Sequence, residues 1–300
     1  MKILFTFPGQ GGQRPGMLAA LPDREAILTQ ARAVLGNEVA TLDSADALQH
    51  TRAVQLCLLI AGVAWARELQ RQGVDPQMVS GLSIGAFPAA VIAGALDFAS
   101  ALRLVALRGD LMEQAYPEGY GLTAIMGLTR PRVEALMQGH EVYLANLNAE
   151  TQFVIAGRDE AMAEVAQLAL RAGASKAQRL AVSVPSHCAL LDKPAAELAK
   201  AFAGASLRRP WCAYLSGSTA RVLWDPQRIA DDLAMNMARP VHWQEAMVAA
   251  DERDARLAIE MPPGGVLTCL TRQAGWRGET IALERSGLDV ARHLAQRLSD

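Results

Sequence analysis

Residues 79–87 read VSGLSIGAF, an apolar run leading into a serine that has a glycine two positions away on each side. The run Met78–Leu82 predicts a short buried strand, and Ile84–Ala95 predicts a helix that begins directly after Ser83. The spacing G-x-S-x-G between a strand and a helix is typical of a sharp turn that presents a nucleophilic serine. Serine is also a favoured N-cap residue, so this stretch alone leaves both interpretations of Ser83 open.

Strands and helices alternate on both sides of this turn. Apolar runs predict strands at Ile3–Phe7, Ala213–Ser216, Leu257–Met261 and Thr280–Leu283, with helical patterns between them. Alternation of this kind predicts a parallel sheet with helices on both faces, because the crossover helices must cover it.

The middle of the chain has a different order, β-α-β-β-α-β, with its last strand predicted at Gln178–Val184. This order is typical of a ferredoxin-like unit. We therefore expect an α/β core formed by residues 1–121 and 186–300, with a small ferredoxin-like insert formed by residues 122–185.

Composition excludes several classes of function. The chain has 300 residues and a net charge of −2, so it has no electrostatic footprint for nucleic acid or an anionic membrane. No stretch predicts a signal peptide or a membrane span. The four cysteines are scattered and form no zinc or disulfide pattern, so we expect no metal and a cytoplasmic location.

A nucleophilic serine needs a base, and the best candidate among five histidines is His187. It lies in SVPSHCALL, where a predicted strand ends at a proline, and α/β sheets place their sites at strand ends. His242, beside Trp243, is the weaker competitor. No carboxylate stands in a motif that marks it as a third catalytic group, so a carbonyl could orient the imidazole instead.

Arg108 lies in LVALRGDLM, within an apolar helix pattern. It either extends to the surface or is kept to bind a buried anion, for which its bidentate guanidinium is suited.

Taken together, these segments resemble the malonyl-CoA:acyl-carrier-protein transacylase family over nearly the whole chain. Seven segments carry the resemblance in the right order: FPGQGGQ (7–13), GLSIGAF (81–87), LVALRGDLM (104–112), NAETQFVIAG (148–157), VSVPSHCALL (182–191), NMARPVHW (236–243) and MPPGGVLTCL (261–270). The family fold is a hydrolase-like α/β core with a ferredoxin-like insert, in agreement with the pattern above.

The resemblance implies a role for each matching residue. Ser83 would be the nucleophile and His187 its base, oriented by the main-chain carbonyl of Asn236. The backbone N–H groups of Gln10 and Ile84 would form the oxyanion hole. Arg108 would bind the malonyl carboxylate, and the predicted substrate-binding set is completed by Met112 and Asn148.

The implied reaction moves a malonyl group from malonyl-CoA, through a serine ester, to the phosphopantetheine-type thiol of an acyl carrier protein. No permanently bound cofactor is expected. Leu82, Ala86 and Phe87 depart from the family's usual elbow and resemble the epsilon subunit of malonate decarboxylase, which implies other decarboxylase subunits as partners. The alternatives are a transacylase of fatty-acid or polyketide synthesis, a serine thioesterase or hydrolase, and a non-catalytic scaffold.

Overall fold

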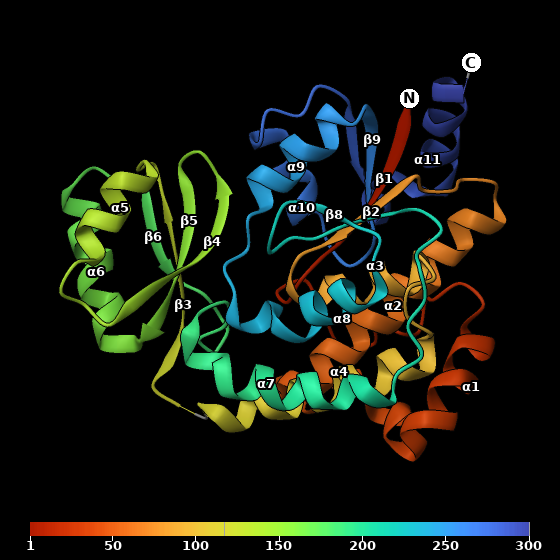
Figure 1. Cartoon of the computed structure of the whole chain (residues 1–300), viewed down its shortest axis with the longest axis horizontal. Helices are drawn as coiled ribbons and strands as arrows, with labels where there is room; N and C mark the ends of the chain where they lie inside the picture. Colours follow the sequence, from red (N-terminus) through yellow and green to blue (C-terminus); the bar gives the residue numbers. More distant parts are fainter. Residues whose placement is uncertain (117, 300) are drawn as a thin grey trace.

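The computed structural model describes residues 1–116 and 118–299 and contains two sheets (Figure 1). The larger sheet has the strand order β10-β9-β1-β2-β7-β8, in which every neighbouring pair is parallel except β7 and β8. Its strands are β1 (Lys2–Phe7), β2 (Met78–Gly81), β7 (Ala213–Leu215), β8 (Val222–Leu223), β9 (Ala255–Glu260) and β10 (Glu279–Ala282).

Alternate residues of these strands pack on opposite faces of the larger sheet. Phe5, Val79 and Ile259 contact a thick helical layer, whereas Leu4 and Met78 contact a thinner one. The thick layer contains α1 (Arg24–Leu35), α2 (Thr51–Arg71), α3 (Ala86–Ile92), α4 (Phe98–Ala115), α7 (Asp192–Ala201), α8 (Pro226–Met235) and α11 (Leu283–Ser299, interrupted at Gly287). The thinner layer contains α9 (Trp243–Glu252) and α10 (Val266–Gln273). The sheet is therefore buried on both faces.

The second sheet is antiparallel, with the order β4-β5-β3-β6. It lies to the left of the larger sheet in Figure 1. Its elements follow the chain order β3 (Tyr120–Met126), α5 (Arg130–Met137), β4 (Val142–Ala149), β5 (Gln152–Arg158), α6 (Asp159–Arg171) and β6 (Lys176–Arg179). This is the ferredoxin-like arrangement, so the predicted fold class is confirmed. The exact domain boundaries remain a prediction.

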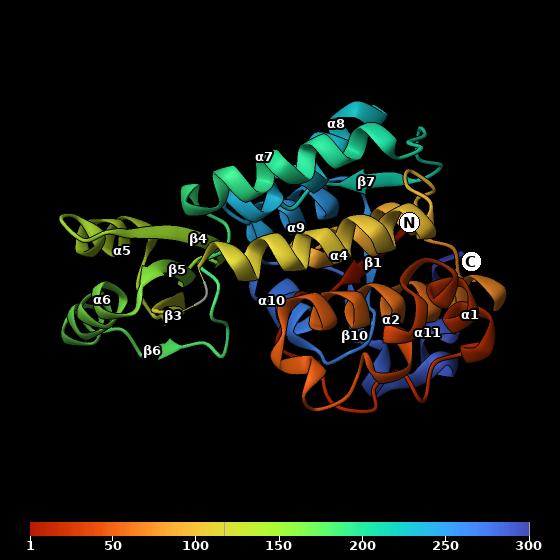
Figure 2. The same ribbon diagram turned by 90° about the horizontal axis from the view of Figure 1, so that it is seen from below.

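One face of the second sheet packs on α5 and α6, and the other faces the segment that carries His187. Leu122, Val154 and Ala156 on that second face form a cluster with Cys188, the residue after His187. In the larger unit, α4 and α7 lie side by side and extend toward the second sheet (Figure 2). The small sheet thus supports the backbone beside the predicted base.

Two predicted boundaries were wrong. The strand expected at Gln178–Val184 ends at Arg179, whose guanidinium donates to the carbonyls of Leu180 and Val182 and so holds them out of the ladder. The helix expected at Ile84–Ala95 starts with a 3₁₀ turn, η3 (Ser83–Gly85), and its α-helical part ends at Ile92 before Gly94, whose φ is +74°. Other 3₁₀ turns are η1 (Gly36–Thr41), η2 (Ala47–Gln49), η4 (Ala189–Leu191), η5 (Phe202–Gly204) and η6 (Asn236–Ala238).

Within the described residues, no helix combines the length and the apolar character needed to cross a membrane.

Candidate active site

Ser83 is the first residue of η3, separated from the end of β2 by Leu82, and its backbone is left-handed, with φ +58°. A Cβ on Gly81 would lie 2.0 Å from the carbonyl carbon of Gly85, and a Cβ on Gly85 would lie 2.1 Å from the carbonyl oxygen of Phe7. Both glycines are therefore required by close backbone contacts. The N-cap of η3 is Leu82 and that of α3 is Gly85, and among the described residues Ser83 Oγ contacts only Arg108 and His187, so the interpretation of Ser83 as an N-cap is wrong.

The Ser83 hydroxyl instead faces His187, whose Nε2 lies 2.9 Å from Ser83 Oγ. His187 Nδ1 lies 2.8 Å from the carbonyl oxygen of Asn236 and 3.2 Å from that of Arg239. Carbonyl oxygens only accept, so Nδ1 carries the proton and Nε2 is free to accept from the serine. Among the described residues, no carboxylate contacts the imidazole. His242, the predicted competitor, lies beside Glu245 and makes no hydrogen bond to Ser83 within the described part of the chain.

Burial, together with the positive charge of Arg108, lowers the pKa of His187 to about 4. The two carbonyl contacts oppose this shift but are weaker than the burial. At neutral pH the imidazole is therefore uncharged and able to accept a proton.

Arg108 is fully buried on α4, which contradicts the surface alternative. Its Nη2 donates to Ser83 Oγ at 3.2 Å and to Asn236 Oδ1 at 2.9 Å, and its Nη1 donates to Gln55 Oε1 at 2.7 Å. The guanidinium carbon lies 5.9 Å from the centre of the Phe87 ring. Burial lowers the pKa of Arg108 to about 9, so the group is still charged at neutral pH.

In the part of the chain that the structure describes, no carboxylate pairs with Arg108, and its Nε has no hydrogen-bond partner. A buried cation without a counter-charge is costly, and an anion bound beside it would offset that cost. The site is therefore suited to an acyl group that carries its own carboxylate.

The close packing of α2 and α4 brings Gln55 to Arg108. A Cβ on Gly109 would lie 2.4 Å from Cα of Arg52, so glycine allows these helices to approach. Sequence reasoning missed Gln55, which is fully buried. The one signal for it was a lone glutamine in the otherwise apolar stretch 53–64.

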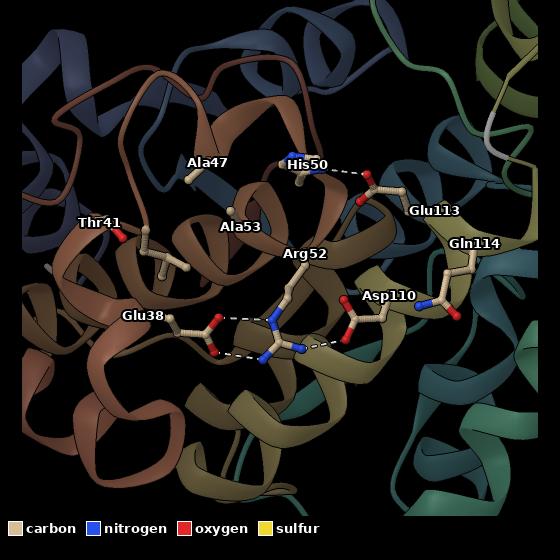
Figure 3. Close-up of a pocket in the computed structure, with 10 residues that line it drawn as sticks. Glu38, Thr41, Ala47, His50, Arg52, Ala53, Asp110, Glu113 and Gln114 are labelled. Carbon is tan, nitrogen blue, oxygen red and sulfur yellow. Dashed lines mark hydrogen bonds and ion pairs between the residues drawn. The ribbon is translucent and has the colours of Figure 1, made fainter.

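Outside this site, polar side chains of η1, of α4 and of the start of α2 pair with one another. Arg52 binds both carboxylate oxygens of Glu38 at 2.7 and 3.1 Å and Asp110 at 2.6 Å, and His50 lies 2.8 Å from Glu113 (Figure 3). These residues line a cavity of about 590 Å³ to which neither Ser83 nor His187 contributes. The cavity is therefore separate from the serine–histidine pair.

The other predicted site residues lie on the loop after β1 (Gln10), on η3 (Ile84) and on α4 (Met112). Gln10 approaches through a loop in which a Cβ on Gly9 would lie 2.9 Å from the Leu82 side chain, and its Oε1 is 3.4 Å from Gln55 Nε2. Ile84 lies in the first turn of η3, where backbone N–H groups lack intrahelical acceptors. Met112 is buried and its sulfur accepts from Gln55 at 3.3 Å.

Asn148 is the predicted residue with the least support. It lies on β4, and its buried Oδ1 has no hydrogen-bond partner among the described residues. Its substrate-binding role stays a prediction.

A second cavity, of about 310 Å³, opens beside Gln10. Side chains of Gln13, Thr51, Arg179 and Ser183 contribute polar groups to its lining. Within residues 1–116 and 118–299, no cluster of three histidine, cysteine or carboxylate side chains is placed to hold a metal ion.

A serine at the carboxyl edge of a parallel sheet, hydrogen-bonded to a neutral imidazole, is characteristic of α/β enzymes that transfer or hydrolyse acyl groups. A family model described as the acyl transferase domain matches residues 4–286. The chain therefore belongs to the acyl transferase family, and it is an enzyme.

Relatives and solved structures agree with this assignment. The malonyl CoA-acyl carrier protein transacylase of Escherichia coli K12 is 37% identical over 285 residues, covering 91% of this chain and 92% of that protein. The Bacillus subtilis protein of the same name is 33% identical, covering 94% and 93%. The solved transacylase of Coxiella burnetii superposes with a TM-score of 0.92 at 32% identity, covering 100% and 98%. A malonyl-transacylase solved in complex with a type II polyketide acyl-carrier protein gives 0.91 at 34%, covering 98% and 99%.

Proposed function

We propose that this enzyme is a malonyl-CoA:acyl-carrier-protein S-malonyltransferase that works through an ester on Ser83. The observation that carries the proposal is the buried cation Arg108, whose Nη2 lies 3.2 Å from the serine oxygen and which pairs with no carboxylate in the described part of the chain. A malonyl group esterified to that oxygen would place its free carboxylate within reach of the guanidinium. The names of the relatives support the same substrate and the same kind of acceptor.

In the first half-reaction, Ser83 Oγ attacks the thioester carbonyl carbon while His187 Nε2 accepts the hydroxyl proton. The N–H groups of Gln10 and Ile84 would stabilise the oxyanion. The carbon–sulfur bond then breaks, and the leaving sulfur takes the proton from the imidazolium as free CoA thiol.

In the second half-reaction, His187 takes the proton of the carrier thiol, and the sulfur attacks the malonyl ester. The ester bond to Ser83 breaks, and the serine oxygen recovers the proton. The malonyl carboxylate is retained throughout, so this step does not decarboxylate. The polar cavity beside Gln10 suits the amide-bearing phosphopantetheine arm that must deliver either thiol.

Mass spectrometry of the intact protein after acid quench tests the chemistry. We expect malonyl-CoA to add one malonyl group at Ser83, and a holo acyl carrier protein to remove it as malonyl-carrier. Ser83→Ala should abolish both the adduct and the transfer. Transfer that survives in Ser83→Ala would contradict catalysis through a Ser83 ester, and a wild-type protein that gains no adduct and transfers nothing would leave the scaffold alternative standing. Hydrolysis of the ester faster than carrier transfer would favour a thioesterase.

The particular acceptor is a separate proposal. Leu82, Ala86 and Phe87 support the carrier subunit of malonate decarboxylase, with its CoA-derived prosthetic group, as the physiological acceptor. The relatives named above are transacylases of acyl carrier protein, which support the fatty-acid or polyketide alternative. Comparing kcat/KM for the two purified holo carriers decides between them: a preference for the fatty-acid carrier would rule out the decarboxylase role.

A further inference from the structure

A single residue, Asn236, contacts all three groups of the predicted site. Its main-chain oxygen lies 2.8 Å from His187 Nδ1, its Oδ1 accepts from Arg108 Nη2 at 2.9 Å, and its Nδ2 donates to the main-chain oxygen of Ser83 at 3.2 Å. The residue is buried. The main-chain contact accounts for the orientation of the imidazole, but it leaves the two side-chain contacts without a role.

We propose that the Asn236 amide is a positioning residue that selects acyl groups carrying a carboxylate, by holding Arg108 against the nucleophile. The inference rests on the proposed malonyl transfer. It assigns the selection between acyl groups to two neutral amides: Gln55, which accepts from Nη1 of Arg108, and Asn236, which accepts from Nη2.

The hydrogen-bond inventory of Arg108 supports this role. A guanidinium has five N–H groups. One Nη1 N–H is taken by Gln55, one Nη2 N–H by Asn236, and the other Nη2 N–H by Ser83 Oγ. The contact to Ser83 points toward the oxygen that becomes the ester oxygen. Two N–H groups, the second of Nη1 and that of Nε, have no partner among the described residues and remain for a carboxylate on the acyl group.

The neutrality of the two amides matters as much as their positions. A carboxylate at position 236 would hold Arg108 equally well, but it would neutralise the charge that the substrate needs. It would also remove part of the positive field that keeps His187 uncharged. The Asn236 amide holds the guanidinium of Arg108 in place without neutralising its charge. Because its Nδ2 also donates to the Ser83 carbonyl, the guanidinium is held in a defined position relative to the turn at Ser83. The site is thus organised before substrate binds.

The test compares Asn236→Leu, Asn236→Asp and Asn236→Gln in single-turnover acylation of the full-length enzyme by malonyl-CoA and acetyl-CoA. All three keep the main-chain oxygen that orients His187. We expect Asn236→Leu to lower malonyl acylation roughly ten- to a hundredfold, with a smaller effect on acetyl acylation. Asn236→Asp should lower malonyl acylation further and move the acid limb of its pH profile upward. Asn236→Gln, which keeps an amide, should retain more malonyl preference than Asn236→Leu.

Two controls separate this role from a structural one. Asn37→Asp makes the same charge change at an exposed position and should behave as wild type. Titration with a serine-reactive phosphonate counts molecules with a competent Ser83–His187 pair, so rates are compared per folded site. An unchanged malonyl-to-acetyl ratio and pH profile in Asn236→Leu and Asn236→Asp would overturn the positioning role. A wild-type enzyme without malonyl preference would instead overturn the proposed function itself.

Discussion

Arg108 donates a hydrogen bond to Ser83 Oγ at 3.2 Å, so a buried cation touches the predicted nucleophile before any substrate is bound. The same oxygen lies 2.9 Å from Nε2 of His187, the predicted base. Ser83 Oγ thus contacts both the cation expected to bind the substrate carboxylate and the imidazole expected to accept the serine proton. The first two predictions below depend on this arrangement.

Replacing Arg108 should change which acyl group the enzyme accepts. Arg108→Gln removes the charge that would pair with the malonyl carboxylate, leaving that carboxylate desolvated without a partner. We expect kcat/KM for malonyl-CoA to fall by a factor of about 100 or more, since breaking a buried ion pair costs roughly 3 kcal/mol or more. Acetyl-CoA, which has no carboxylate, should lose much less or even gain.

Arg103→Gln is the matched control, because Arg103 lies on the same helix but is exposed. It should leave both rates unchanged. An equal loss for malonyl-CoA and acetyl-CoA in Arg108→Gln would show that Arg108 does not recognise the carboxylate.

The pH dependence should differ between the free and the loaded enzyme. The pKa of His187 is lowered to about 4 in the free site, so kcat/KM for acylation should stay flat near neutrality and fall only as the pH approaches 4. A bound malonyl carboxylate offsets the charge of Arg108, which raises the pKa of His187. The acid limb of the maximal acylation rate with malonyl-CoA should therefore lie at higher pH than that of kcat/KM.

Acetyl-CoA provides the internal control for this displacement, because it brings no negative charge to Arg108. Stopped-flow acylation between pH 3.5 and 8 measures both limbs for both substrates. The same displacement with acetyl-CoA would contradict an origin in carboxylate pairing.

Gly109→Ala should disturb the site through the packing of α2 against α4. Its Cβ would lie 2.4 Å from Cα of Arg52, so α2 and α4 would have to separate, and Gln55 would move away from Arg108. We expect a loss of about 2 kcal/mol in the free energy of unfolding, together with weaker discrimination between malonyl and acetyl groups. Gly204→Ala, where a Cβ meets nothing within 4 Å, should leave stability and activity nearly unchanged. Denaturant unfolding of both variants checks the pair.

Alkylation should distinguish Ser83 chemistry from thiol chemistry. Burial raises the pKa of the Cys57 thiol well above its usual value, that of Cys188 to about 11 and that of Cys212 to about 12. Cys269 is exposed. Iodoacetamide at pH 7.5 should therefore modify Cys269 in the native enzyme without loss of activity, and all four thiols after unfolding. Rapid inactivation linked to alkylation of Cys188, next to the predicted base, would contradict this expectation.

The local part of the site could be predicted because its constraints are local. The contact that requires Gly81 lies inside the tight turn, and the contact that requires Gly85 is made by the carbonyl of Phe7 on the neighbouring strand β1. Both act on the turn itself and therefore leave the G-x-S-x-G pattern in the sequence. Gln55 could not be predicted in the same way. A buried glutamine on an apolar helix has no periodicity that identifies its partner, and that partner lies 53 residues further along the chain. The end of β6 also escaped prediction, because Arg179 holds it through contacts that an apolar pattern does not reveal.

By itself the sequence determined the order of strands and helices, the turn at Ser83 and the supply of a serine, a histidine and an arginine. Only the tertiary structure decided how they act together. Ser83 and His187 are 104 residues apart, and Arg108 and Asn236 are 128 apart. The contact between Nδ1 of His187 and the carbonyl of Asn236 places the imidazole proton on Nδ1. Burial in the assembled core lowers the pKa of both His187 and Arg108. Such shifts arise from desolvation and neighbouring charge, which exist only once the chain has folded around them.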